Sequence, residues 1–348
     1  MMKKNTKLSA YKKNEFIAYG IALIFVVIIL ILDATGQLTR SLKGQLVPIV
    51  AYMIMSVSLN LVVGISGELS LGHAGFMSVG AFSGIITSMY LSNFISSDIV
   101  RFIIAIFIGG IMAGIAGFLI GIPVLRLRGD YLAIVTLAFG EIIRNVLNIV
   151  YVGMDKNGLH FSTKSDLVLD NGTMILNGPM GAIGNKEIST FLYGIIILYI
   201  ILFIIHNIVN SKTGRAIMAI RDNRIAAESI GLSIMKYKMT AFVISAVLAG
   251  VAGVLFGLNF SSLAPTKFGF NQSILILVFV VLGGIGNIWG GMIAACVLTV
   301  LPEALRGFSD YRMLAYAVVL ILVMLFTNNK ELRYKLSSKK KKGGDGIG

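Results

Sequence analysis

Residues 102–122 read FIIAIFIGGIMAGIAGFLIGI, a stretch without a single charged side chain. A helix needs about 20 apolar residues to cross the hydrocarbon core of a bilayer. An uncharged run of this length is therefore typical of a transmembrane helix. Similar runs recur along the whole chain. The other predicted spans are residues 16–32, 46–63, 71–91, 131–152, 190–209, 239–259, 273–288, 290–301 and 313–326.

The eighth and ninth of these segments, 273–288 and 290–301, are short, and they could form one broken pair or a re-entrant element. We therefore predict an all-α polytopic membrane protein with about nine or ten transmembrane helices.

The overall composition agrees with this prediction. Apolar residues make up 56% of the chain and charged residues 13%, whereas an ordinary soluble domain carries about 25% charged residues. The net charge of +14 arises from Lys and Arg that flank the apolar runs. They do not interleave with aromatic residues on a folded domain, so we predict no nucleic-acid partner. The lone cysteine, Cys296, excludes an intrachain disulfide.

Lys and Arg residues also indicate the orientation, because they are enriched on the cytoplasmic side of membrane proteins. With ten spans and a cytoplasmic amino terminus, 20 of the 30 Lys and Arg residues are cytoplasmic and nine are external. We therefore expect both termini to be cytoplasmic. The predicted regions are a basic amino terminus (1–15), a transmembrane permease domain (16–328) with an extracytoplasmic loop (153–189) and a cytoplasmic coupling loop (210–238), and a basic tail (329–348) that lies against membrane lipid.

Two segments resemble each other within the chain. Residues 113–121 (AGIAGFLIG) and 249–257 (AGVAGVLFG) are identical at six of nine positions. The predicted topology runs their helices in opposite directions, as an inverted repeat would. Inverted repeats are therefore a possible feature of the fold.

Polar residues inside or beside the apolar segments are candidates for the translocation pathway, because a buried charge in a membrane is costly and is kept for a reason. Residues 64–75 form a Gly-rich break that is either a structural hairpin or a gate. Glu141 and Arg144 share a face of the fifth span, either as a locked ion pair or as pathway lining. The candidates are Asn60, Glu68, His73, Glu141, Arg144 and Asn148.

The segment 212–236 predicts two short cytoplasmic helices. Thr213 is a plausible cap for the first, Asn223 for the second, and Gly231 ends the second. A seven-residue helix is marginal in water by itself. Its apolar face, Ile225, Ala226 and Ile230, would be stabilised in a groove of another protein, so we predict a docking loop.

No catalytic or metal-binding set is visible in the sequence. His73, His160 and His206 lie far apart, and no Gly-x4-Gly-Lys-Ser/Thr phosphate loop is present. We predict that the chain is not an enzyme and binds no metal or cofactor. If ATP drives its action, the nucleotide is bound by partner subunits.

The predicted docking loop carries a sequence pattern that is known from other proteins. Residues 226–231 (AAESIG) are similar to the Glu-Ala-Ala-x-x-x-Gly loop that seats ABC importer permeases in their ATPases, although residue 225 is isoleucine. Residues 126–144 (RLRGDYLAIVTLAFGEIIR), 59–76 and 282–291 (LGGIGNIWGG) extend the likeness. From about residue 48 to 332 the chain resembles the branched-chain amino acid ABC transporter permeases of the LivM type.

This resemblance implies a multi-pass permease subunit of the bacterial inner membrane that works by alternating access. It implies a LivH-like sister permease, two cytoplasmic ATPase subunits and an external solute-binding protein that delivers leucine, isoleucine or valine. The residues it assigns to ATPase coupling are Arg215, Arg221, Asn223, Ala226, Ala227, Glu228 and Gly231.

One departure from the family leaves the solute open. After the fifth span the family usually shows Thr-Gly-Gly-x-x-Gly-Leu, but residues 152–159 read VGMDKNGL. Urea or short-chain amides are therefore alternatives, as is an ion-coupled secondary transporter. That last class should show several acidic residues within its spans, and Glu141 is the one we find.

Overall fold

The computed structural model describes residues 19–20, 23–27, 29, 31, 40–127, 129–155, 158–164, 169, 172–304, 314, 317–318 and 321. It divides into two units, Met1–Cys296 and Val297–Gly348. The first unit holds nearly all the described elements and is the subject below. The predicted amino terminus (1–15) and tail (329–348) lie outside the described residues, as do eight of the 17 residues of the first predicted span and ten of the 14 residues of the tenth.

Six helices in the described part of the chain are long and apolar enough to cross a membrane, and they match six of the predicted spans. Two shorter apolar helices of 14 and 17 residues follow where short segments were predicted. The long helices are α2 (Arg40–Asn60, continued by η1), α3 (His73–Leu91), α4 (Asp98–Val124), α5 (Asp130–Ile149), α6 (Phe191–Asn210) and α9 (Ile234–Gly257), and the short ones are α10 (Phe270–Gly283) and α11 (Ile288–Ala304).

Small residues let α3, α4 and α9 pack with their backbones in contact. A Cβ atom on Gly80 of α3 would overlap the backbone of Gly250 on α9. Close approach of this kind is how helices associate in lipid, where burial of apolar surface gives little drive. Gly121 lies against Met239, whereas Gly109 lies against Val254, so α4 and α9 run antiparallel.

The helix α2 does not simply stop at the Gly-rich break. It continues into η1 (Leu61–Ser66), a π-helical turn of six buried residues. Gly67 ends η1 with a φ of 75°, a conformation that only glycine adopts freely. Single π-helical turns are rare and are frequent at functional sites. The break predicted at 64–75 is therefore a π-turn followed by a tight loop into α3.

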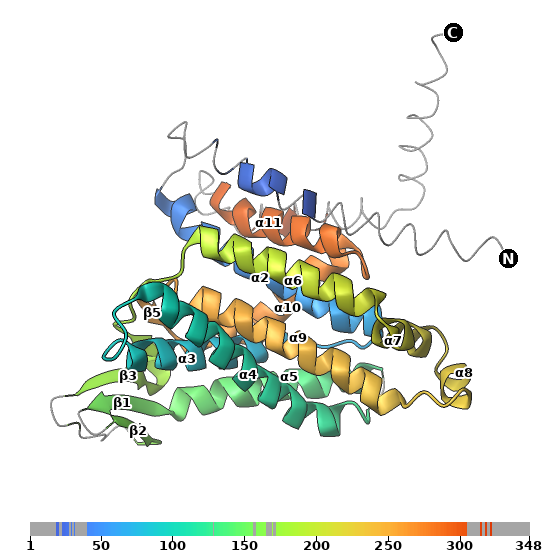
Figure 1. Ribbon diagram of the computed structural model, residues 1–348, viewed down its shortest axis with the longest axis horizontal. Coiled ribbons are helices and arrows are strands. Elements are labelled where there is room, and N and C mark those ends of the chain that lie inside the picture. Colours follow the sequence, from blue (N-terminus) through green and yellow to red (C-terminus); the bar gives the residue numbers. More distant parts are fainter. Residues whose placement is uncertain are drawn as a thin grey trace, which may run out of the picture. The chain divides into compact units, whose positions relative to one another are not determined.

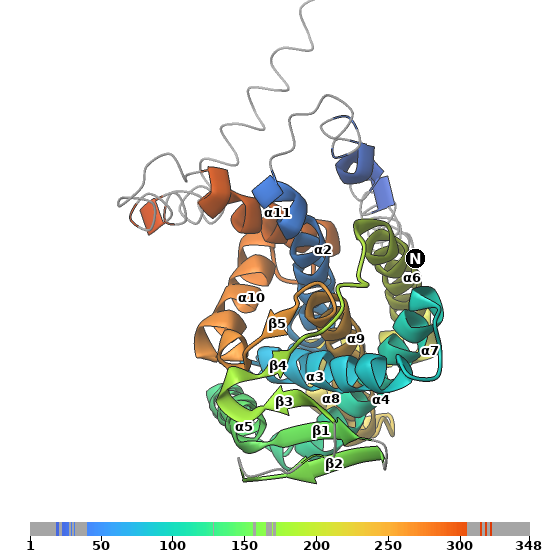
Figure 2. The same ribbon diagram turned by 90° about the vertical axis from the view of Figure 1, so that its left-hand side faces the viewer.

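The segment between α5 and α6 contains a sheet, which the sequence analysis did not predict. Five antiparallel strands pair in the order β2-β1-β3-β4-β5. Four come from this segment and the fifth follows α9, so the sheet joins distant parts of the chain (Figure 2). The strands are β1 (Tyr151–Asp155), β2 (Gly158–Ser162), β3 (Thr173–Asn177), β4 (Ala182–Ile183) and β5 (Ser262–Leu263).

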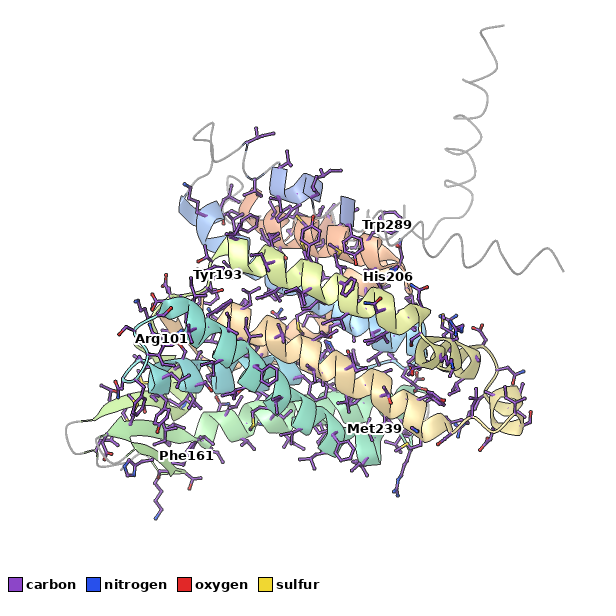
Figure 3. The ribbon with its side chains drawn as sticks, viewed as in Figure 1. Arg101, Phe161, Tyr193, His206, Met239 and Trp289 are labelled. Carbon is purple, nitrogen blue, oxygen red and sulfur yellow. The ribbon has the colours of Figure 1, made fainter. Side chains whose placement is uncertain are left out.

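The sheet and the segment between α6 and α9 lie at opposite ends of the long helices (Figure 1). That segment forms two helices, α7 (Lys212–Asp222) and α8 (Arg224–Ser229). Arg101 and Met239, on neighbouring helices, mark the two ends in Figure 3. At the sheet end Asp98 pairs with Arg101 and, at 2.8 Å, with Lys186, which ties the start of α4 to the segment before α6.

Candidate functional site

The two short helices α7 and α8 are capped by polar side chains. Ser211 Oγ accepts a hydrogen bond from the Gly214 amide at 3.1 Å, so the predicted cap Thr213 is wrong by two residues. The predicted cap of α8 is confirmed, because Asn223 Oδ1 accepts from the Ala226 amide at 3.1 Å. Gly231, with a φ of 83°, ends α8 as predicted.

The apolar face of α8 is not covered by the part of the chain that the structure describes. Ile225 is 81% and Ile230 74% exposed, whereas Ala227 is buried against the protein. Ala226 and Glu228 are also exposed. Large aliphatic side chains exposed in this way, at the end of the molecule opposite the sheet, indicate an interaction surface.

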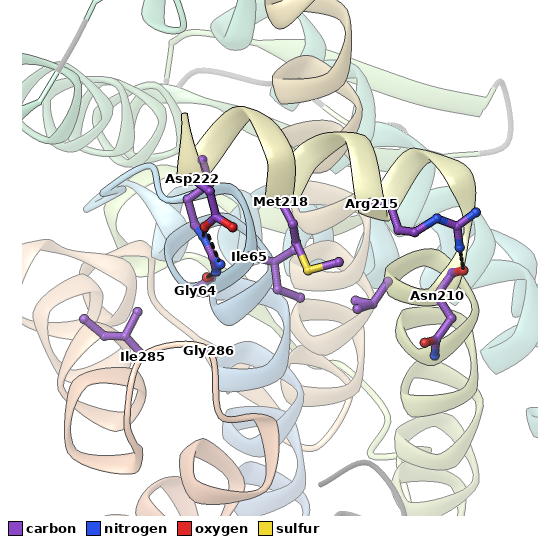
Figure 4. A pocket seen from close by; sticks show the side chains of 10 residues that line it. Gly64, Ile65, Asn210, Arg215, Met218, Asp222, Ile285 and Gly286 are labelled. Carbon is purple, nitrogen blue, oxygen red and sulfur yellow. Dashed lines mark hydrogen bonds and ion pairs between the residues drawn. The ribbon is translucent and has the colours of Figure 1, made fainter. Parts of the chain in front are cut away.

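Two arginines of α7 connect it to the long helices. Arg215 Nη1 donates to the Asn210 carbonyl at the end of α6 at 2.8 Å. Arg221 Nη1 donates to the Gly64 carbonyl in η1 at 2.7 Å, while its guanidinium pairs with Asp222. A cavity of about 450 Å³ lies between α7, the end of α6, η1 and the α10–α11 turn (Figure 4).

The predicted pathway candidate Asn60 lies at the same end. Its Oδ1 accepts a hydrogen bond from the Gly286 amide in the α10–α11 turn at 2.9 Å. Asn60 is buried, and its Nδ2 has no hydrogen-bond partner in the structure. The end of α2 is therefore held to the turn between the two short helices.

The predicted pathway candidate Glu68 is paired within the protein. Its carboxylate forms an ion pair with the ammonium group of Lys238 in the first turns of α9, and both side chains are largely buried. Beside this pair lies a second cavity of about 480 Å³, lined by Arg126, Arg224 and Glu228 among others. The pair fixes the loop before α3 to α9.

His73 is enclosed in the bundle at the start of α3. Its Nε2 lies 3.0 Å from Ser58 Oγ, and its ring meets Phe76 edge to face. The imidazole is buried. These contacts join the start of α3 to α2, which is a structural role for His73.

The charged pair on α5 lies against the segment before α10, because a Cβ on Gly269 would lie 3.6 Å from Arg144 Cδ and 3.7 Å from Glu141 Oε1. Arg144 and Glu141 are bonded at 2.7 Å, as their spacing predicted, and each side chain remains about 30% exposed. One turn further, Asn148 Oδ1 is buried without a partner. Of the six long helices α5 is the least buried, with 22% of its apolar window inside the protein. A polar stripe on such a helix requires cover from protein or water.

The sequence pattern of a known family, described as the branched-chain amino acid transport system permease component, matches residues 41–327. The chain belongs to this permease family. The six long apolar helices in the described part of the chain agree with a multi-pass membrane protein.

Individual relatives of the permease carry related names. The high-affinity branched-chain amino acid permease protein LivM of Escherichia coli K12 is 35% identical over 79% of this chain and 66% of its own. The ribose import permease protein RbsC of E. coli K12 is 28% identical over 57% of this chain and 60% of its own. The permease protein LivH of Salmonella typhimurium is 36% identical over 33% of this chain and 38% of its own.

The permease thus spans just under two thirds of the length of the LivM protein that it matches. No solved structure matches the chain.

The site candidates of this chain separate into three groups. Asn60 and Glu68 lie at the end of the bundle that carries α7 and α8, and His73 is enclosed between α2 and α3. Glu141, Arg144 and Asn148 form a half-buried polar stripe on α5. Among the described residues no group of histidine, cysteine or acidic side chains could hold a metal ion.

Sequence reasoning missed the partners of several candidates: Gly64 and Gly286 at the end that carries α7, Lys238 beside Glu68, and Ser58 beside His73. A signal existed for the two glycines, since both lie in Gly-rich turns. No such turn marks Ser58 or Lys238, which lie within α2 and α9.

Proposed function

We propose that this chain is a membrane-spanning subunit of an ATP-driven importer for leucine, isoleucine and valine. The observation that carries the proposal is the uncovered face of α8, where Ile225 and Ile230 project from a helix capped at Asn223 and ended at Gly231. A helix this short gains stability when its apolar side chains enter a groove of another protein. The names of the LivM and LivH relatives support this class of transport.

The occupant of that surface is an ATPase subunit in this proposal. Ile225, Ala226 and Ile230 enter its groove, and Glu228 and Gly231 border the contact. Ala227 seats α8 on the permease, while Arg215 and Arg221 join α7 to the long helices. Two such ATPases bind and hydrolyse ATP, and the chain itself binds no cofactor.

A sister permease of the LivH kind covers the half-buried polar stripe of α5. Glu141 and Arg144 each keep about 30% exposure, and the cost of presenting such groups to lipid supports this position. The solute path then runs along this stripe between the two permeases. A carboxylate beside a guanidinium suits the ammonium and carboxylate groups of an amino acid, and this favours amino acids over urea, amides or sugars.

The transmembrane arrangement in this proposal has nine or ten spans in inverted repeats. Both termini and α7–α8 are cytoplasmic, as the Lys and Arg distribution supports. The sheet then faces outward, where an external binding protein delivers the solute. Movement of α8 by the ATPases switches the pair of permeases between outward- and inward-facing states.

The docking role is tested with Ile225→Asp and Ile230→Asp, because both side chains are exposed and their replacement leaves the core intact. We expect each change to reduce copurification of the ATPases and leucine uptake at least about tenfold, as for a central interface residue. Leu127→Asp is the control, at the same end of the bundle but outside α8. Wild-type copurification and uptake in both variants would contradict the proposal.

The solute is tested by competition in the same uptake assay. We expect unlabelled valine and isoleucine to displace labelled leucine, and urea, acetamide and ribose to have no effect. Competition by urea or acetamide alone would assign the transporter to the amide class.

A further inference from the structure

The Gly64 carbonyl is the point at which the docking segment reaches the transmembrane helices. Arg221 Nη1 donates to it at 2.7 Å from 157 residues further along the chain. The aliphatic part of the same side chain packs on the turn that ends η1, since a Cβ on Gly67 would lie 2.6 Å from Arg221 Cγ. The Arg221 side chain therefore contacts η1 through both its guanidinium group and its aliphatic part.

The opposite face of η1 touches the α10–α11 turn. A Cβ on Gly64 would lie 2.6 Å from the Gly286 Cα, so the two backbones are in direct contact. Asn60 Oδ1, one turn before Gly64, holds the Gly286 amide at 2.9 Å. The turn itself is shaped by Gly286, whose φ is 83°. Gly64 is thus enclosed between α7 on one side and the α10–α11 turn on the other.

The helix that carries Arg221 is fixed to the bundle by its own apolar side. Ile217 and Ile220 of α7 are buried, so α7 holds the base of the Arg221 side chain beside η1. The 450 Å³ cavity beside the contact is lined by Arg221, Gly64 and Gly286 (Figure 4). Packed protein resists displacement, and this cavity leaves η1 and the turn room to shift.

We infer that Arg221 is a positioning residue that transmits the movement of α7 to Gly64 and, through the Gly64–Gly286 contact, to the ends of α2 and α10. This inference rests on the proposed function, because an ATPase must move α8 and α7 for the link to act. It adds a route from the docking surface to two transmembrane helices. Proximity alone does not establish such a route, so the tests below measure the coupling itself.

The first test uses the complete transporter with Arg221→Gln and Arg221→Lys, reconstituted in liposomes with its ATPases. We expect Arg221→Gln to assemble and hydrolyse ATP while the leucine taken up per ATP falls about tenfold or more, as for loss of a charged hydrogen bond. Arg221→Lys should recover part of the loss, because an ammonium group supplies one donor to the carbonyl. Lys212→Gln, exposed at the start of α7, is the matched control and should behave as the parent.

The second test follows the α10–α11 turn directly. A spin label at Ile285→Cys, 61% exposed, is introduced in a Cys296→Ser background. We expect ATP to change the label spectrum in the parent and in Lys212→Gln, and to leave it unchanged in Arg221→Gln. A residue with a purely structural role would not remove this response while assembly and hydrolysis persist.

Several outcomes overturn the inference. Uptake per ATP within twofold of the parent in Arg221→Gln would do so, as would an undiminished response of the Ile285 label. Failure of both Arg221→Gln and Arg221→Lys to assemble would show that Arg221 serves folding. A parent chain that binds no ATPase would instead refute the proposed function, and the inference with it.

Discussion

Ser58 on α2 and Ser245 on α9 donate their hydroxyl protons to each other's main-chain carbonyl oxygen, at 2.6 and 2.7 Å. Because Ser58 uses its one proton in this way, His73 Nε2, 3.0 Å from Ser58 Oγ, is the donor to that hydroxyl. All three side chains are buried. Polar groups inside a membrane bundle must be partnered within the protein, and this set joins α2, α3 and α9.

Replacement of Ser58 or Ser245 by alanine should therefore lower the stability of the bundle. We expect about 0.5–2 kcal/mol for each, the range of interhelical hydrogen bonds in membranes. The double change should cost less than the sum, since the two residues share partners. Thermal unfolding in detergent measures this, with the exposed Ser92→Ala as control. Strictly additive losses would show that the two serines act separately.

Gly253→Ala should be more damaging than any exposed glycine substitution in the bundle. A Cβ there would lie 2.9 Å from the Ala81 amide nitrogen and closer still to the Met77 carbonyl, so α3 and α9 would have to separate. Overpacking of this kind costs about 1–3 kcal/mol. Gly44→Ala on α2, with nothing within 4 Å, should be neutral or slightly stabilising. Equal melting temperatures for the two variants would exclude close packing as the reason for Gly253.

The Glu141–Arg144 pair predicts that a double variant is less damaging than a single one. Arg144→Met leaves a lone carboxylate on α5, and loss of one partner of a buried pair costs about 3–5 kcal/mol. Because these side chains keep some exposure, we expect the lower end of that range or less. The double variant Glu141→Gln/Arg144→Met should retain more assembled transporter than Arg144→Met. Size-exclusion yield of the solubilised complex measures this, and a worse double variant would contradict the ion-pair account.

Asn223 tests whether α8 must be preformed in order to dock. Asn223→Ala removes the acceptor for the Ala226 amide and should destabilise α8 by about 1 kcal/mol. Asn223→Asp keeps an acceptor and should retain binding. We expect the affinity for the ATPase subunit to fall severalfold in the alanine variant, measured by titration of the solubilised permease. Equal affinities for the alanine and aspartate variants would show that the cap is not needed.

The local features of the fold were predictable from the sequence. The run at 102–122 lies within α4, and the pattern at 223–231 gave a capped helix with its stop glycine, because apolar length and capping chemistry act over a few residues. The Glu141–Arg144 contact was predictable for the same reason. The predicted cap Thr213 was wrong because Ser211, two residues earlier, also carries a hydroxyl, and the backbone places that one at the start of α7.

The sequence by itself determined that this chain is a bundle of apolar helices with two short polar helices between the sixth and seventh predicted spans, since hydrophobic length and local hydrogen bonding depend on neighbours along the chain. Tertiary structure alone decided that Ala182–Ile183 pair with Ser262–Leu263 in the sheet, that Lys238 meets Glu68, and that Arg221 meets Gly64. Those contacts join residues about 80 to 170 positions apart. They exist only because the packing of α3, α4 and α9 through their small residues brings the ends of distant helices together.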